Sequence, residues 1–181
     1  MSSHLNESGT PRMVDVGAKS STVRRATAEG RVYIPFLLDE HRDTKEWWSP
    51  KGPVFQTAVI AGIQGAKATS TTIPLCHPLP ITRCDVTVEP AGAGSMGAQD
   101  RSARSGSHPP AGGTEIVVRC TVETDAKTGV EMEALCGVSA ACLTVYDMGK
   151  SVTHGIRIGS IELVEKTGGK RDWHRDAPEG R

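Results

Sequence analysis

Cys76 and His77 lie in the most conformationally restricted stretch of this 181-residue chain, Ile73–Pro80 (IPLCHPLP). Three prolines within seven residues fix backbone dihedrals there and preclude a helix. A stiff loop of this kind holds an imidazole and a thiol in fixed directions, so His77 either orients a ligand and moves protons or simply completes a surface loop. Adjacent residues rarely chelate one ion, and no CxxC or HxxH motif accompanies them, so no metal site is indicated.

Asp147 and Lys150 form a second candidate pair near the end of a helix that we expect over residues 130–152. Their i, i+3 spacing places both side chains on one helix face. Such a pair is either an exposed ion pair of little energetic weight or a coupled acid and base. Small residues on the same face favour close approach by a ligand or by another chain; they are Gly137, Ala140, Thr144 and Ser151.

Glu131 and Glu133 open the same predicted helix, where carboxylates complement the positive end of the helix dipole. Sixteen residues separate Glu131 from Asp147, which is roughly 24 Å at about 1.5 Å per residue. The two ends cannot easily serve one small-molecule site within one subunit. If both are functional, the spacing predicts either two sites or a symmetric oligomer with sites at its interfaces.

Basic side chains are spread across predicted loops and helix edges, and each is most simply a solvated surface charge. Lys+Arg and Asp+Glu both total 21, so the formal net charge is zero, and a whole-surface nucleic-acid binder is not expected. A focused phosphate pocket needs no net excess of charge. Thr167–Lys170 (TGGK) lacks the spacing of a P-loop. The candidates for a phosphate pocket are Arg24, Lys51, Lys67, Lys127, Lys150 and Lys170.

Six predicted elements must position these groups. They are strands over 29–37, 83–89, 115–124 and 156–165 and helices over 54–71 and 130–152. The order βαββαβ predicts an α+β, ferredoxin-like fold, in which an antiparallel sheet carries two helices on one face. Three cysteines fall on apolar faces of these elements and are expected to be buried hydrophobes: Cys84, Cys120 and Cys142.

The remaining segments are expected to be flexible and to flank or interrupt a single domain over 13–166. They are a polar lead (1–12), an inserted loop (90–114) and a tail (167–181). In the inserted loop, 13 of 25 residues are Gly, Pro or Ser, too polar to offset ordering entropy. Apolar runs fall far short of the ~20 residues that span a bilayer. With no signal peptide and no paired cysteines, we expect no membrane partner and a cytoplasmic location, or the mitochondrial matrix in a eukaryote.

Six motifs in order closely resemble the MoaC family, the cyclic pyranopterin monophosphate synthases of molybdenum cofactor biosynthesis. They are MVDVGAK (13–19), AGIQGAK (61–67), IPLCHPLP (73–80), TGVEMEAL (128–135), TVYDMGK (144–150) and EKTGGK (165–170). The resemblance implies a ferredoxin-like subunit and a hexamer built as a trimer of dimers. It also implies a lyase that converts 3',8-cyclo-7,8-dihydro-GTP, made by a separate radical SAM GTP cyclase, into cyclic pyranopterin monophosphate with release of diphosphate. No cofactor or metal ligand set is evident.

The same motifs assign roles to individual positions. The resemblance makes Asp147 a catalytic acid or base, with Lys150, Lys51 and His77 also in the catalytic set. Arg24 matches a further phosphate-binding position, and Lys67 is expected to add positive charge for the departing diphosphate. The substrate-binding positions carried over from the LCH and EME motifs are Leu75, Cys76, His77, Met132 and Glu133.

Two departures from the family pattern lie near Lys51. The family usually reads KGD where this chain has Lys51-Gly52-Pro53, and it usually has Arg where this chain has Val59. Both changes could weaken a phosphate contact. They favour the alternative function, a degenerate ferredoxin-like module that binds a nucleotide or a partner without catalysis. Formation of a pterin product together with diphosphate would distinguish the enzyme from such a module.

Overall fold

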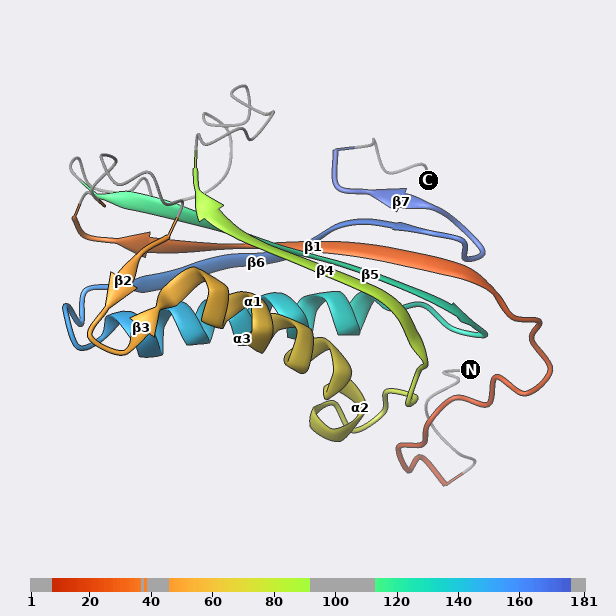
Figure 1. Ribbon diagram of the computed structural model, residues 1–181. Helices are drawn as coiled ribbons and strands as arrows, with labels where there is room; N and C mark the ends of the chain where they lie inside the picture. Colours follow the sequence, from red (N-terminus) through yellow and green to blue (C-terminus); the bar gives the residue numbers. More distant parts are fainter. Residues whose placement is uncertain (1–7, 37, 39–45, 92–112, 177–181) are drawn as a thin grey trace.

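The protein folds as an antiparallel sheet with its helices on one face (Figure 1). The computed structural model describes residues 8–36, 38, 46–91 and 113–176. The sheet runs in the order β4-β5-β1-β6-β7, and every neighbouring pair is antiparallel. Its strands are β1 (Thr22–Ile34), β4 (Ile81–Pro90), β5 (Thr114–Ala126), β6 (Arg157–Thr167) and β7 (Trp173–His174). The predicted α+β class with a mostly antiparallel sheet is confirmed.

Two long helices, α1 (Val54–Lys67) and α3 (Glu131–Gly149), pack side by side against the sheet (Figure 1). A single turn, α2 (Thr69–Thr72), follows α1. The strands β2 (Trp48–Ser49) and β3 (Gly52–Pro53) form a small separate hairpin directly before α1. Because the hairpin runs straight into α1, it lies at the N-terminal end of that helix, where it can reach α3.

The core between sheet and helices consists mainly of valine, isoleucine and alanine. Cys120 and Cys142 are fully buried in it, as predicted, whereas Cys84 is half-buried. Burial raises the pKa of the Cys142 thiol to about 12, so this cysteine behaves as a small hydrophobe. The aliphatic core compensates for the low aromatic content of the chain.

Close contact between the two helices explains the small residues of α3. A Cβ atom on Gly65 of α1 would lie 2.5 Å from the Cβ of Ala140 and 2.8 Å from the Cys136 carbonyl. Gly137 of α3 likewise faces the backbone carbonyl of Gly62. We expected this small-residue face to admit a ligand or another chain. For Gly137 and Ala140 that expectation is wrong, because α1 of the same chain occupies the space.

Strand β1 begins seven residues before the predicted start at residue 29. Its first half carries arginines and threonines that hide the usual apolar alternation, and these pair across the sheet, Arg25 opposite Glu123 and Thr27 opposite Thr121. The predicted helix over 54–71 ends instead at Lys67. The helix is interrupted at Ala68, and α2 takes up residues 69–72, so most of the predicted span is helical in two pieces. At the junction the hydroxyl of Thr69 donates to the carbonyl of Ala66 at 2.9 Å.

Part of the predicted flexible tail is a strand. In β7, Trp173 pairs with Lys166 and His174 with Glu165. The next residue, Arg175, donates its backbone N–H to the carbonyl of Val164 at 2.8 Å. The predicted lead, inserted loop and end of the tail fall wholly or partly on residues 1–7, 92–112 and 177–181, which lie outside the described residues. No described helix is long and apolar enough to cross a membrane.

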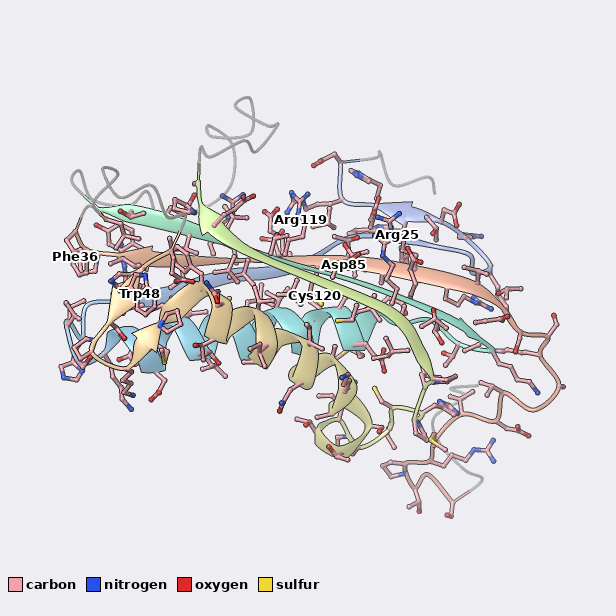
Figure 2. The ribbon with its side chains drawn as sticks, in the orientation of Figure 1. Arg25, Phe36, Trp48, Asp85, Arg119 and Cys120 are labelled. Carbon is pink, nitrogen blue, oxygen red and sulfur yellow. The ribbon has the colours of Figure 1, made fainter. Side chains whose placement is uncertain are left out.

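The sheet face opposite the helices is charged. Figure 2 shows Arg25 and Arg119 on that face, while Cys120 points toward the helices. Glu29 is buried there and accepts hydrogen bonds from Arg119 at 2.6 Å and from Arg31 at 2.8 Å. Burial alone would raise the pKa of Glu29, but the two guanidinium groups outweigh it and lower the pKa. A buried charge is thus stable here because it is fully paired.

Candidate active site

Asp147 lies between two ammonium groups that come from distant parts of the chain. Lys150, one turn further along the chain, places its Nζ 2.7 Å from Oδ1. Lys51, from the turn of the β2–β3 hairpin, places its Nζ 2.8 Å from Oδ2 and donates to the Asp147 carbonyl at 2.8 Å. We call Lys51, Asp147 and Lys150 the carboxylate cluster. All three side chains remain accessible to solvent, with 39 to 55% of their surface exposed.

The two lysines hold the carboxylate in its ionised form. Hydrogen bonds from Lys150 and then from Lys51 lower the pKa of Asp147 to about 2. Reciprocally, Asp147 raises the pKa of Lys150. In the free protein Asp147 is therefore an anion at neutral pH, and its shift is away from the near-neutral value expected of a poised acid or base.

The carboxyl of Asp147 should titrate near pH 2 in the wild-type protein, as followed by carbon NMR. Lys150→Met should move the midpoint toward the ordinary value of 3.8 by more than Lys51→Met, because Lys150 makes the larger contribution. Since the folded pKa is depressed, the stability gained from this cluster is complete above about pH 4 and is lost as the pH falls toward 2. A wild-type midpoint at or above the ordinary value would contradict the ion-paired geometry.

The proline-braced loop lies at the opposite end of α3. His77, Cys76 and Leu75 line a cavity of about 310 Å³ together with Met132 and Glu133 from the first turn of α3. The Nε2 of His77 lies 2.9 Å from the Val14 carbonyl oxygen. Because a carbonyl can only accept, Nε2 donates a proton in this contact, and Nδ1 is the ring nitrogen left for other partners. We call this space the His77 cavity.

Glu133 and Cys76 are shifted toward their protonated forms. Glu133 is 4% exposed, and burial raises its pKa, with a further contribution from the nearby Glu131 and an opposing one from its own backbone N–H. Burial also raises the pKa of the Cys76 thiol, helped by Glu133 and Cys136. The environments at the two ends of α3 thus push carboxyl pKa values apart, down for Asp147 and up for Glu133.

A second, strongly basic cavity of about 590 Å³ adjoins the His77 cavity and shares four lining residues with it, Lys19, Thr128, Gly129 and Glu131. Among the described residues that line it, Glu131 is the only carboxylate, and Lys166 pairs with it at 2.9 Å. Its seven basic residues are Lys19, Arg24, Arg25, Lys127, Lys166, Lys170 and Arg171. We call this space the basic cavity.

The loop after β6 brings Lys170 and Arg171 to the basic cavity. Gly168 makes this possible, because its φ of +82° and its contact with the Val23 carbonyl leave no room for a side chain. Thr22 donates its hydroxyl to the Gly168 carbonyl at 3.0 Å. The loop is therefore tied to the start of β1, next to Arg24.

The predicted site residues therefore fall into two groups. Lys51, Asp147 and Lys150 meet at the end of α3, while the loop residues and the EME residues meet at its beginning, with Arg24 in the adjoining basic cavity. Lys67, the last residue of α1, lines neither cavity. Sequence reasoning did not single out Lys19, Arg25, Lys166 or Arg171. For Lys19 and Lys166 a signal existed, since each lies within a motif quoted above.

The two departures near Lys51 leave the carboxylate cluster intact. Val59 is half-buried and packs against the hydrophobic core. Pro53 is the N-cap residue of α1 and offers no side-chain hydrogen bond, yet Lys51 still reaches Asp147. A proline at position 53 is thus compatible with the contact between Lys51 and Asp147.

Comparison with known proteins gives consistent matches over almost the whole chain. A protein named cyclic pyranopterin monophosphate synthase from Xanthomonas campestris pv. campestris (strain B100) is 44% identical over 169 residues, 93% of this chain and 90% of that protein. One with the same name from Thermomicrobium roseum is 43% identical, covering 98% of this chain and 95% of the relative. A molybdenum cofactor biosynthesis bifunctional protein from Synechocystis is 44% identical over 95% of this chain, and the chain spans 45% of its length.

The family model supports the same grouping. The model described as MoaC family matches residues 13–169, which include the carboxylate cluster and both cavities apart from Lys170 and Arg171. This match and the relatives above agree with the motifs quoted from the sequence. The chain therefore belongs to the MoaC family.

Proposed function

We propose that this protein is a lyase of molybdenum cofactor biosynthesis that converts 3',8-cyclo-7,8-dihydro-GTP into cyclic pyranopterin monophosphate and diphosphate. The observation that carries the proposal is the carboxylate cluster, present with both lysines in contact with Asp147, in a chain of the MoaC family. Relatives with 90 to 95% of their length matched bear the name of this synthase.

The basic cavity is the proposed binding place of the triphosphate. Seven basic side chains line it; Arg25 pairs with Glu123 and Glu165 and Lys166 with Glu131, and the remaining cations supply a local positive field in a protein with no net charge. Closing the cyclic phosphate releases diphosphate, and fixed cations stabilise the negative charge that builds up on that leaving group. Lys170 and Arg171, on the loop after β6, would contact its outer oxygens.

Proton transfers are assigned to groups whose pKa values lie apart. Asp147 is ionised and can accept a proton, whereas the buried Glu133 tends to keep one and can donate it. Anionic substrate near the carboxylate cluster competes for the ammonium groups of Lys51 and Lys150. When the hydrogen bonds from the two lysines to Asp147 weaken, the pKa of Asp147 rises toward the range in which it works as a base. His77, whose Nε2 donates to the Val14 carbonyl, would use its other ring nitrogen to orient the pterin ring or relay a proton.

A shared site reconciles the two groups of residues. The carboxylate cluster and the His77 cavity occupy opposite ends of α3, roughly 24 Å apart by helix rise. We therefore propose that the carboxylate cluster of one protomer completes the cavities of its neighbour, in a hexamer arranged as a trimer of dimers. The strand order β4-β5-β1-β6 with helices on one face supports a ferredoxin-like description of each subunit. A radical SAM GTP cyclase would supply the substrate.

The alternative, a non-catalytic binding module, is not favoured. It depended on Pro53 and Val59 having disabled Lys51, but Lys51 donates to both the carboxylate and the carbonyl of Asp147. Nucleotide binding alone would not distinguish the two functions, because both require it.

The direct experiment supplies the purified protein with 3',8-cyclo-7,8-dihydro-GTP. Mass spectrometry should detect cyclic pyranopterin monophosphate, with diphosphate released in equal amount. Lys51→Met, which keeps the side-chain length but removes the charge, should slow conversion by about 10²-fold or more. Tight substrate binding without any pterin product would establish the non-catalytic module instead.

A further inference from the structure

Glu46 caps helix α1 from seven residues upstream of its N-cap position. Its Oε1 accepts a hydrogen bond from the Phe55 N–H at 2.7 Å, and its Oε2 accepts one from the Gln56 N–H at 3.0 Å. The carbonyl of the next residue, Trp47, accepts from the Val54 N–H at 2.9 Å. The first three N–H groups of α1 are therefore satisfied by Glu46 and Trp47, a task that an N-cap side chain usually performs at least in part.

The chain between these anchor points is the β2–β3 hairpin. Trp48 pairs with Pro53, and Ser49 pairs with Gly52, whose φ of +112° suits the tight turn. Lys51 sits in that turn, and its N–H donates to the Ser49 hydroxyl at 3.1 Å. Both ends of the hairpin thus meet at the start of α1, with Lys51 projecting from the closed loop.

Trp47 connects the same segment to α3. A Cβ atom on Gly149 would lie 2.5 Å from the Trp47 indole, so the ring lies directly against the last turn of α3. The Trp47 ring also packs edge-on with the Phe36 ring, with the two ring centroids 6.0 Å apart. The hairpin is therefore held against the part of α3 that carries Asp147.

We propose that Glu46 is a positioning residue for Lys51: by capping α1 it closes the β2–β3 hairpin and fixes the backbone from which Lys51 reaches Asp147. The inference rests on the role proposed above for Lys51. Glu46 itself contacts the backbone of α1, and it acts through the hairpin. A lysine side chain rotates about four bonds. Its ammonium therefore keeps two contacts at 2.8 Å only if the backbone that carries it is held in place.

The test compares Glu46→Ala with Glu46→Gln and with a control in the sheet, Val122→Ala. Glu46→Ala should lower turnover by about tenfold to a hundredfold, since small misplacement of a catalytic group is costly. It should also raise the midpoint of the NMR titration of Asp147, as is expected for Lys51→Met. Glu46→Gln keeps one accepting oxygen and should recover part of both effects. Val122 is fully buried in the core, so Val122→Ala should lower the melting temperature without changing the Asp147 titration.

A double variant separates positioning from general destabilisation. In Lys51→Met/Glu46→Ala, the Asp147 midpoint should equal that of Lys51→Met alone, because the lysine through which Glu46 acts is gone. A further shift in the double variant, or no shift in Glu46→Ala, would overturn the proposal. The NMR readout does not require activity. If Lys51→Met retained full turnover, the catalytic role of Lys51 would fail while the titrations still reported whether Glu46 positions it.

Discussion

Asp147→Asn should reduce turnover about 10³-fold while leaving the fold intact, because the amide cannot accept a proton or balance two ammonium groups. Asp147 is more than half exposed, so the exchange of a carboxylate for an isosteric amide should change the melting temperature little. Lys150→Ala should have a comparable effect, since it removes the stronger of the two partners of Asp147. Steady-state turnover measured beside thermal unfolding checks both variants.

Asp85 provides a matched control for Asp147. Its carboxylate is equally exposed, 54% against 55%, and it is also ion-paired, with the Arg83 Nε 2.6 Å from its Oδ2. Asp85 lies on β4, lines neither cavity and makes no ion pair with the carboxylate cluster. Asp85→Asn should therefore leave turnover unchanged. Wild-type turnover in Asp147→Asn would remove this carboxylate from the mechanism.

His77→Ala and Asp147→Asn should each be nearly inactive, yet restore activity when the two proteins are co-expressed. If each site takes its cavities from one protomer and its carboxylate cluster from another, a mixed pair contains one site with neither substitution. Random pairing across a two-fold interface then predicts recovery of about a quarter of wild-type turnover. Differently tagged copies, purified through both tags and confirmed by native mass spectrometry, give the mixed assembly.

The control for complementation combines two substitutions at the same end of α3. Asp147→Asn and Lys150→Ala both damage the carboxylate cluster, so no arrangement of mixed protomers contains an intact one, and activity should stay low. Verified mixed assemblies of His77→Ala with Asp147→Asn that remained inactive would argue that each site lies within one subunit. A fully active monomer would do the same.

Local patterns predicted those features that depend on neighbours in the chain. The apolar stripe located α3 to within three residues at each end, and the i, i+3 spacing placed Asp147 beside Lys150. Alternation likewise located β4 and β5. In these elements the same residues determine both the local conformation and the buried face, so their periodicity is visible without knowledge of the fold.

Features created by distant contacts were harder to predict. The partner of Lys51 lies 96 residues away, and no periodicity links the two. The polar first half of β1 forms a strand because β5 and β6 pair with it on its two sides, and β7 forms because β6 pairs with it. Glu46 gave no capping signal, since such signals are normally sought at the N-cap residue itself. Residue types singled out Lys51, His77 and Arg24 as candidates and the motif resemblance assigned their roles, but neither revealed the basic cavity that Arg24 lines.

Helix α3 imposes a limit on how this protein can vary in length. Its 19 residues separate the two halves of the proposed site, and inserting or deleting one residue would rotate everything beyond that point by about 100°. Asp147 would then turn away from Lys51, and the close passage against α1 at Gly137 would be lost. Length changes are instead expected in connections such as the one between β4 and β5, where added residues do not alter the spacing along the helix.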